Sequence, residues 1–289
     1  MANLDYSSPS SIKEVVKILT AAKGKAKVMA GGTDLLVQLR AGRLKASTIV
    51  DVKNISELRT IKKEKNGFTI GAAVSGAELG AHKAVNKAWP GVVEGLELIG
   101  STQIQGRASL GGNLCNGSPA ADGVPAMIAA GATCLVVGPK GSRTVAVEKI
   151  VVGPGKTSLK PGEFVVSFFL PNRGKNSGDA YLRFIPRTEM DIAVVGVGVN
   201  IMLDKNGICS DARVSLGAIA PTALLVKDCA KALIGTKIDE AALNVLSEAA
   251  KSACNPIDDK RGTIEYRTKV TGVLVKRAAI IALKRARKN

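Results

Sequence analysis

Two glycine turns, far apart in the chain, constrain what it can fold into. The segment AGGTD at 30–34 follows a predicted strand and opens a predicted helix, and SLGGN at 109–113 begins the glycine-rich segment 109–122. Glycine has no Cβ and tolerates positive φ, so backbone at such turns can approach a ligand closely and aim unpaired N–H groups at it. Taken alone, either segment also fits an ordinary tight turn, and for 109–122 the local sequence favours that interpretation.

Strands and short helices alternate through the first half of the chain, which predicts an α+β domain. An apolar stripe at spacings of three and four predicts a helix that begins after Ser10 and Ser11 and ends near Gly24. Asp34 is placed to cap the helix that follows the first glycine turn. Further apolar segments predict strands at 27–30, 48–52, 68–74 and 162–170, a hairpin at 133–147 and a helix around 92–98.

The polar stretch 172–179 predicts a boundary between two domains, at residues 1–174 and 175–289. Beyond it, apolar segments flank a Lys-Asn-Gly turn, and helical spacing begins near Val226. The second domain is therefore predicted to be a few antiparallel strands backed by helices. Its predicted strands are 192–203 and 212–220.

Positive charge is concentrated at the C-terminal end. The chain has 41 Lys and Arg against 24 Asp and Glu, a net charge of +17, and no acidic residue follows Glu265. In 267–289, basic and apolar residues recur at spacings of three or four, which predicts an amphipathic helix with its charges on a solvated outer face. Contact with nucleic acid is the alternative, and the 3% aromatic content argues against it.

Several chemistries have no signature in the sequence. The five cysteines form no CxxC pair, no GxGxxG or GxxxxGK[ST] segment is present, and His82 is the only histidine. These absences argue against a metal site, a Rossmann or Walker nucleotide site, and histidine-dependent catalysis. Cys115 is predicted to be a small packing residue rather than a reactive thiol. The two glycine turns remain, and together they suggest a dinucleotide held between two lobes by backbone amides.

The expected location is the cytoplasm. The N-terminal segment lacks the charged and apolar pattern of a secretory signal. No apolar run reaches the roughly eighteen to twenty residues that a membrane helix needs. Unpaired cysteines are typical of a compartment that keeps thiols reduced.

Six segments resemble, in order, successive motifs of one family: the FAD-binding, or medium, subunits of molybdenum hydroxylases of the xanthine dehydrogenase and carbon monoxide dehydrogenase type. They are VMAGGTDLL (28–36), IGSTQIQGRASLGGNLCNGSPAAD (99–122), GPGKTSLKPGEFVVSFFLP (153–171), YLRFIPRTEMDIAVVGVGV (181–199), SDARVSLGAIAPTALL (210–225) and EYRTKVTGVLVKRA (265–278). This resemblance implies a two-lobed FAD-binding domain of the vanillyl-alcohol-oxidase (PCMH) type. It also implies a C-terminal domain with a three-stranded antiparallel sheet and helices.

The resemblance also implies which residues contact FAD. The first pyrophosphate-binding turn would be Val28, Met29, Ala30, Gly31, Gly32, Thr33, Asp34 and Leu35, with backbone amides from Gly31 to Asp34. The second would be Ser109, Leu110, Gly111, Gly112 and Asn113. Asp122 matches a position that binds the sugar portion of the flavin, and Gly100 and Ser101 match flavin-contacting positions. Val165 and Val166 fall beside the isoalloxazine. Lys156 and Arg183 fall at basic positions near the cofactor.

In such a family the flavin carries the redox chemistry, so no catalytic side chain and no metal ligand is predicted in this chain. The implied partners are a large subunit with a molybdenum-pterin centre and a small subunit with [2Fe-2S] clusters, and the basic charge suits acidic partner surfaces. The implied acceptor is NAD+, a quinone or another carrier. Thr33 and Asp34 stand where carbon monoxide dehydrogenases are expected to have His and Ser, which favours a purine-, heteroaromatic- or aldehyde-oxidising complex.

Two other functions fit parts of the sequence. A basic nucleic-acid-binding protein would use the C-terminal helix and would be colourless. A flavin reductase of the same fold would act alone on NADPH and a substrate, but the sequence contains no second catalytic constellation to support it.

Overall fold

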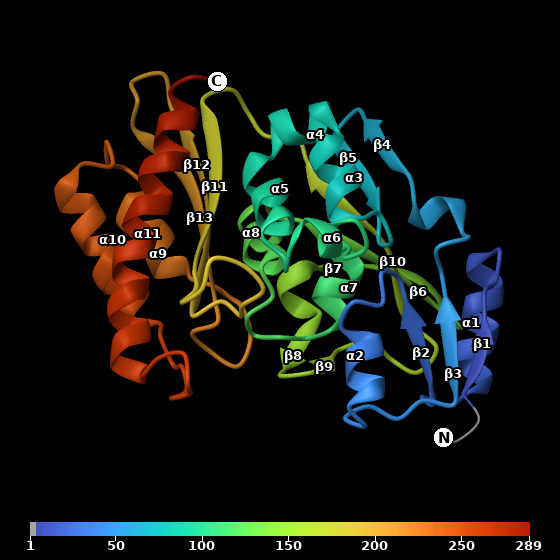
Figure 1. The fold of residues 1–289 in the computed structure, drawn as a ribbon. Coiled ribbons are helices and arrows are strands. Elements are labelled where there is room, and N and C mark those ends of the chain that lie inside the picture. The colour runs from blue at the N-terminus through green and yellow to red at the C-terminus, as the bar shows by residue number, and fades with distance from the viewer. Residues whose placement is uncertain (1–3) are drawn as a thin grey trace.

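The computed structural model describes residues 4–289, and its first lobe is a small parallel sheet with one covering helix (Figure 1). The strands pair in the order β1-β3-β2. Ser11 caps α1 by accepting a hydrogen bond from the N–H of Glu14, and Val15 and Leu19 are buried, which confirms the predicted helix. The elements are β1 (Asp5–Ser7), α1 (Ile12–Ala21), β2 (Ala26–Met29), α2 (Leu35–Arg40) and β3 (Thr48–Asp51).

The predicted cap by Asp34 is wrong. Asp34 precedes α2, but its side chain accepts no capping hydrogen bond. Its backbone is already helical, with φ −94° and ψ −43°. A capping side chain reaches back over the first turn from an extended backbone, so the helical conformation of Asp34 prevents the cap.

The second lobe is a five-stranded antiparallel sheet, in the order β4-β5-β10-β6-β7, with helices packed beside it. The predicted hairpin at 133–147 is confirmed by the pairing of β6 with β7. The strands are β4 (Ile61–Glu64), β5 (Gly67–Gly71), β6 (Thr133–Gly138), β7 (Gly141–Ala146) and β10 (Phe164–Pro171), and a small hairpin joins β8 (Val151–Gly153) to β9 (Lys156–Thr157). The helices are η1 (Ser56–Leu58), α3 (Gly76–Ala81), α4 (Lys83–Ala88), α5 (Pro90–Glu97), α6 (Thr102–Gln105), α7 (Leu110–Cys115), α8 (Gly123–Ala129) and η2 (Val147–Lys149).

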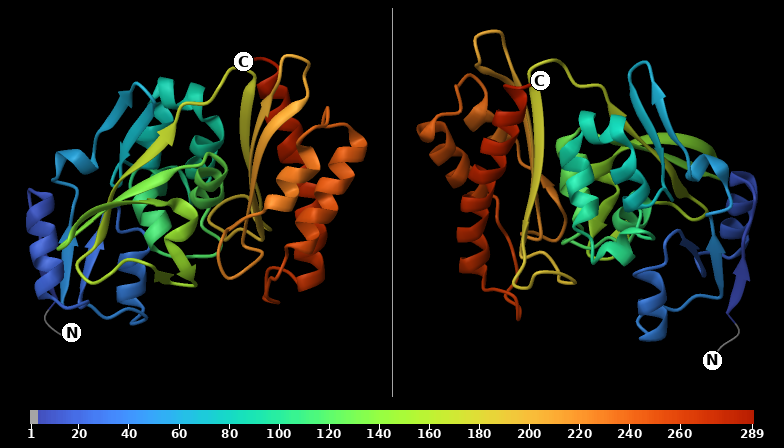
Figure 2. Two further views of the ribbon diagram at one scale, coloured as in Figure 1. Left: turned by 180° about the vertical axis from the view of Figure 1, so that it is seen from behind. Right: turned by 45° about the horizontal axis from the view of Figure 1, so that its top comes forward.

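The C-terminal part is a four-stranded antiparallel sheet with helices on both faces (Figures 1 and 2). Helices α9–α11 cover one face, and α5 and α8 of the second lobe cover the other. A Cβ on Gly178 would lie 2.1 Å from the carbonyl oxygen of Ala282, and one on Gly198 would lie 2.5 Å from that of Pro125, so both layers approach the sheet closely. The elements are β11 (Ser177–Phe184), β12 (Val195–Leu203), β13 (Cys209–Gly217), β14 (Leu224–Leu225), α9 (Lys227–Leu233), α10 (Glu240–Ser252) and α11 (Ile264–Ala286).

This sheet departs from its expected form at both ends. The implied three-stranded sheet has a short fourth strand, β14, and β11 begins within the polar stretch 172–179, just after the predicted boundary. That stretch reads as polar because of Ser177 and Asp179, yet both are buried. The Asp179 carboxylate accepts hydrogen bonds from the N–H of Gly91 and from Arg173. Polar residues with buried partners can occupy a core strand, and a composition rule cannot detect those partners.

The charges of α11 are only partly on the solvated face that was predicted for them. Lys269 and Arg277 are exposed, whereas Arg267 is buried. Its guanidinium donates to the carbonyl of Val194 at 2.8 Å and pairs with Asp259 at 2.7 Å. The half-buried Arg285 pairs with Glu94 of α5 and so joins the two parts of the molecule.

Among residues 4–289, no helix is both long and apolar enough to cross a membrane.

Candidate cofactor pocket

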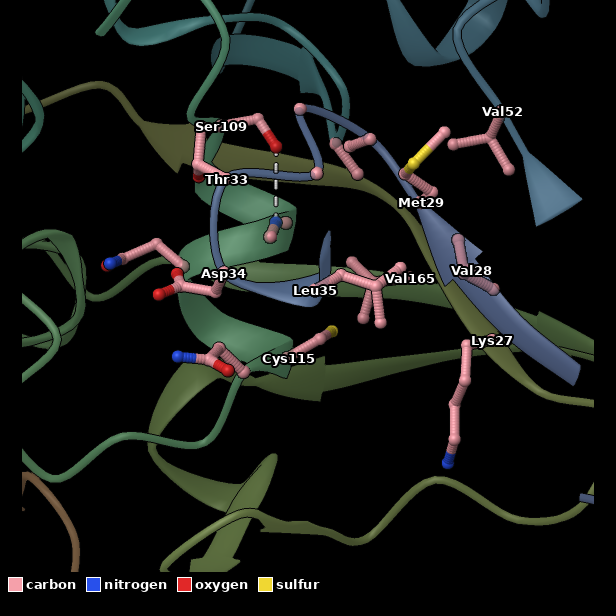
Figure 3. Close-up of a pocket in the computed structure, with 18 of the residues that line it drawn as sticks. Lys27, Val28, Met29, Thr33, Asp34, Leu35, Val52, Ser109, Cys115 and Val165 are labelled. Atoms are coloured by element: carbon pink, nitrogen blue, oxygen red, sulfur yellow. Dashed lines mark hydrogen bonds between the residues drawn. The ribbon is translucent and has the colours of Figure 1, made fainter. Parts of the chain in front are cut away.

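A cavity of about 300 Å³ lies where the first glycine turn, α7 and β10 meet (Figure 3). The side chains of Leu35, Val165 and Cys115 face the same space from these segments. Its volume is at the small end of the range for ligand pockets, so it suits part of an extended ligand. The lining residues are Lys27–Leu35, Gln38, Leu44, Val52, Leu58, Ala72, Ile99, Ala108, Ser109, Gly111–Asn113, Cys115, Asn116, Gly155, Leu159 and Glu163–Val165.

The first glycine turn supplies backbone donors at the end of a parallel strand. It follows β2 directly, and the chain then enters α2. Within the described residues, no protein group accepts a hydrogen bond from the backbone N–H of Gly31, Gly32, Thr33 or Asp34. Unpaired N–H groups in succession form a favourable binding site for an anion, and a diphosphate is such an anion. Gly32 has a φ of +76°, a conformation that suits glycine.

The second turn has a different arrangement from the expected one. Ser109 caps α7, and its hydroxyl accepts a hydrogen bond from the N–H of Gly112 at 3.1 Å. The N–H of Gly111 donates to the carbonyl of Ala72 at 3.0 Å, and that of Asn113 donates to the carbonyl of Ser109. These amides are paired inside the protein, so binding of a pyrophosphate by this turn stays a prediction. A Cβ on Gly112 would meet only the Ser109 hydroxyl, at 3.3 Å, and the missing side chain keeps this wall open.

The structure brings most of the predicted site residues together around this cavity. Val28–Leu35, Ser109, Gly111–Asn113 and Val165 line it. Leu110 and Val166 are buried in hydrophobic clusters instead, and Lys156 lies exposed in the β8–β9 hairpin. Gly100 and Ser101 precede α6, outside the lining, where the carbonyl of Gly100 accepts from the N–H of Met190 at 3.3 Å. The contacts predicted for these residues stay predictions.

Asp122 and Arg183 lie together, but outside the cavity lining. The Asp122 carboxylate accepts hydrogen bonds from the Arg183 guanidinium and from the Tyr181 hydroxyl, both at 2.8 Å. Both members of the ion pair are buried. Burial raises the pKa of Asp122 from 3.8 to about 6, and Arg183 offsets only part of that effect. Protein groups thus already satisfy the carboxylate that was predicted to bind the flavin sugar, and that role stays a prediction.

The Asp122 carboxyl is expected to make stability depend on pH. Because its pKa is higher in the folded chain than in the unfolded chain, its stabilising contribution is full below about pH 4 and is lost as the pH rises through about 6. The unfolding free energy of the unmodified chain minus that of Asp122→Asn should therefore fall by about 2 kcal/mol between pH 4 and pH 7. Urea titrations at several pH values measure it, and a flat difference would contradict the assigned pKa.

Several lining residues were missed because they carry no motif of their own. Gln38 of α2 donates to the side chain of Asn116 at 2.7 Å and links the two lobes beside the cavity. Gly155 lies in one of the family-like segments, but only the fold brings it to this wall. No local pattern connects residues so far apart in sequence.

Cys115 lines the cavity and also packs against the hydrophobic core, as predicted for a packing residue. Burial raises the pKa of its thiol to about 12. The thiol is therefore protonated at neutral pH, and a protonated thiol is unsuited to nucleophilic chemistry.

Across residues 4–289, no three His, Cys, Asp or Glu side chains gather in a way that could hold a metal ion.

Known proteins match this chain over nearly its whole length. Residues 2–173 match the family model for the FAD binding domain in molybdopterin dehydrogenase, and residues 180–282 match that for the CO dehydrogenase flavoprotein C-terminal domain. The carbon monoxide dehydrogenase medium chain of Hydrogenophaga pseudoflava is 31% identical over 95% of both chains. A putative xanthine dehydrogenase FAD-binding subunit of Escherichia coli is 29% identical over 94% of this chain and 93% of its own.

Solved structures match the fold equally well. The carbon monoxide dehydrogenase of Hydrogenophaga pseudoflava contains a chain that superposes with a TM-score of 0.94 at 31% identity, over 98% of both chains. Quinoline 2-oxidoreductase of Pseudomonas putida 86 contains one with a TM-score of 0.90 at 26% identity, again over 98% of both.

Proposed function

This chain belongs to the FAD-binding subunits of the molybdenum hydroxylase family, which includes carbon monoxide and xanthine dehydrogenases, and we propose that it transfers electrons from the [2Fe-2S] clusters of a partner subunit, through FAD, to an external acceptor. The observation that carries the proposal is the turn of unpaired N–H groups at Gly31–Asp34 that lines the cavity of a chain matched end to end by this family.

The residues present fit a dinucleotide cofactor. Gly31–Asp34 would hold the diphosphate through backbone N–H groups. Gly112 leaves room for the diphosphate on the opposite wall. It is exposed, and a side chain at this position would fill space that the glycine leaves free. The apolar side chains of Leu35, Phe164 and Val165 would pack against less polar parts of the cofactor. Such a wall also excludes water.

When bound, FAD supplies the redox chemistry, and the chain contributes binding and orientation. Two titratable side chains of the pocket are each held in one protonation state near neutral pH. Glu163 is paired with Arg143, which lowers the pKa of the carboxyl and keeps it ionised. The Cys115 thiol stays protonated. Neither of these two groups is therefore suited to exchange protons near neutral pH.

The proposed partners are a molybdenum-pterin large subunit and a [2Fe-2S] small subunit, and the proposed acceptor is NAD+, a quinone or another carrier. Three of the relatives are named as medium chains, a term that implies subunits of other sizes. The net charge of +17 favours acidic partner surfaces. Relatives between 26% and 31% identical carry names with different substrates, so identity alone selects no substrate for this complex.

Purification under mild conditions tests this function. The chain should be yellow, release FAD in a near-equimolar amount on denaturation, and bring with it chains that contain molybdenum and [2Fe-2S] clusters. A purified chain that contains no FAD and does not bind added FAD would overturn the proposal. Retention of DNA or RNA by a colourless chain would support the nucleic-acid alternative.

Gly112→Ala is expected to weaken FAD binding without unfolding the protein. The new methyl group would meet only the Ser109 hydroxyl, at 3.3 Å, so the unfolding free energy should change by less than about 1 kcal/mol. The same methyl group would occupy space where the cofactor approaches, and the dissociation constant for FAD should rise by about tenfold or more. Fluorescence titration measures it. Gly153→Ala is the control, because its methyl group has no neighbour closer than 3.9 Å.

A further inference from the structure

A small polar cluster joins the ends of all three strands of the first lobe behind the glycine turn. The Lys53 ammonium donates to the Asp51 carboxylate at 2.6 Å and to the carbonyl oxygen of Ala30 at 2.9 Å. The Tyr6 hydroxyl donates to the same Asp51 oxygen at 2.8 Å. The three strands are parallel, so Tyr6 of β1, Asp51 of β3 and Ala30 after β2 meet at one edge of the sheet.

Lys53 acts on the peptide group that begins the glycine turn. A trans peptide is planar, and its C=O and N–H point in opposite directions. By binding the carbonyl of Ala30, Lys53 therefore also sets the direction of the N–H of Gly31. Ala30 and Gly31 both line the cavity, whereas Lys53 does not. Rotation of this peptide would turn a carbonyl oxygen toward the site proposed for an anion and would remove one of its donors.

The cluster itself is well held. Asp51 is buried, and its second oxygen accepts a hydrogen bond from the backbone N–H of Lys53 at 3.0 Å. Burial raises the pKa of Asp51, but the hydrogen bonds from Lys53 and Tyr6 outweigh this effect, so the pKa is lowered and the carboxylate stays ionised. The ammonium is thereby fixed in front of the Ala30 carbonyl instead of moving freely in solvent.

We propose that Lys53 is a positioning residue for FAD, which holds the Ala30–Gly31 peptide with its N–H available to the diphosphate, while Asp51 and Tyr6 hold Lys53. This inference rests on the proposed function, because it assigns the diphosphate to the turn at Gly31–Asp34. It adds a residue that touches no cofactor and that no motif of the sequence singled out.

The test compares variants of the full chain by titration with FAD and by thermal unfolding without FAD. Lys53→Met keeps an unbranched side chain that is one atom shorter and donates no hydrogen bond, and it should raise the dissociation constant for FAD by about tenfold. Lys53→Arg keeps a charged donor and should restore binding to within about threefold of the unmodified chain. Tyr6→Phe removes one bond at an exposed ring and should raise the dissociation constant by about twofold to threefold.

Lys62→Met is the matched control, because it removes one positive charge from the exposed strand β4 and should leave FAD binding unchanged. Without FAD, Lys53→Met should unfold at a lower temperature than Lys53→Arg, because the buried Asp51 loses its charged partner. FAD binding is therefore compared at a temperature at which both variants are fully folded, so that the difference in binding is not one of folding. The inference is overturned if Lys53→Met binds FAD like the unmodified chain, or if Lys53→Arg fails to restore binding. If the unmodified chain binds no FAD, the proposed function itself fails.

Discussion

Gly31→Ala is expected to purify without FAD and to have an unfolding free energy about 3 kcal/mol lower than that of the unmodified chain. This is the largest effect expected of any single methyl group added to the site. A Cβ at Gly31 would lie 1.9 Å from the carbonyl oxygen of Arg107, 2.4 Å from its carbonyl carbon and 3.0 Å from the backbone nitrogen of Ala108. These atoms are backbone and cannot rotate away. The first turn and the segment before α7 must separate to admit the methyl group.

Urea unfolding and the FAD content of the purified chain measure the two parts of this prediction. Gly112→Ala provides the contrast, since its methyl group would meet only the Ser109 hydroxyl, at 3.3 Å, and should reduce cofactor binding alone. Gly153→Ala should change neither property. A Gly31→Ala chain with unchanged stability and a full content of FAD would show that the two loops do not pack as described.

The role of Gly31 shows how far the sequence could predict this site. The glycine pair after a strand predicted a turn with available N–H groups, and the structure has that turn beside a cavity. The sequence interpretation assigned the glycines of both turns, Gly31 and Gly111 among them, to the approach of a ligand. Gly31 is instead required by the carbonyl of Arg107, and Gly111 by the carbonyl of Ala72, 2.6 Å from a Cβ there. Contacts between residues so far apart depend on the fold, so no local pattern reveals them.

Charged residues were the least predictable part of the chain. Arg267 looked like one of many basic residues on an amphipathic helix, yet it is buried with Asp259 as its partner. Arg285 looked the same and pairs with Glu94, across the two parts of the molecule. Helical periodicity shows which face of a helix is apolar, but a long basic side chain can be buried when a distant carboxylate satisfies it.

The packing of the C-terminal sheet against the second lobe could also be predicted only in part. The apolar segments 192–203 and 212–220 predicted two strands, and the structure has β12 and β13 over much of these ranges. These segments did not predict that α8 would cover the second face of that sheet. The cover depends on Gly198 and Gly217, whose missing side chains admit Pro125, 2.5 Å and 2.7 Å from a Cβ on each. Glycines in a strand indicate close approach, but the sequence does not say of what.

Arg183→Met is expected to reduce the unfolding free energy by about 3 kcal/mol at pH 7, because it leaves the buried Asp122 carboxylate without its charged partner. The Tyr181 hydroxyl remains as a donor to Asp122, but a neutral donor does not balance a buried charge. The loss should be smaller at pH 5, where the carboxyl, whose pKa is already about 6, takes up a proton. Urea titrations at the two pH values measure both effects.

The double variant Asp122→Asn with Arg183→Met separates the ion pair from the packing around it. With both charges removed, no buried charge is left unpaired, so the double variant should be more stable at pH 7 than Arg183→Met alone. Its stability should also no longer depend on the protonation of this carboxyl.

The FAD affinity of Asp122→Asn then tests the role predicted for Asp122. A carboxylate used only to hold Arg183 and Tyr181 would leave FAD affinity almost unchanged, whereas one that binds the flavin sugar would lower FAD affinity without a matching loss of stability. An Arg183→Met chain as stable as the double variant at pH 7 would contradict the assignment of a buried, ionised Asp122.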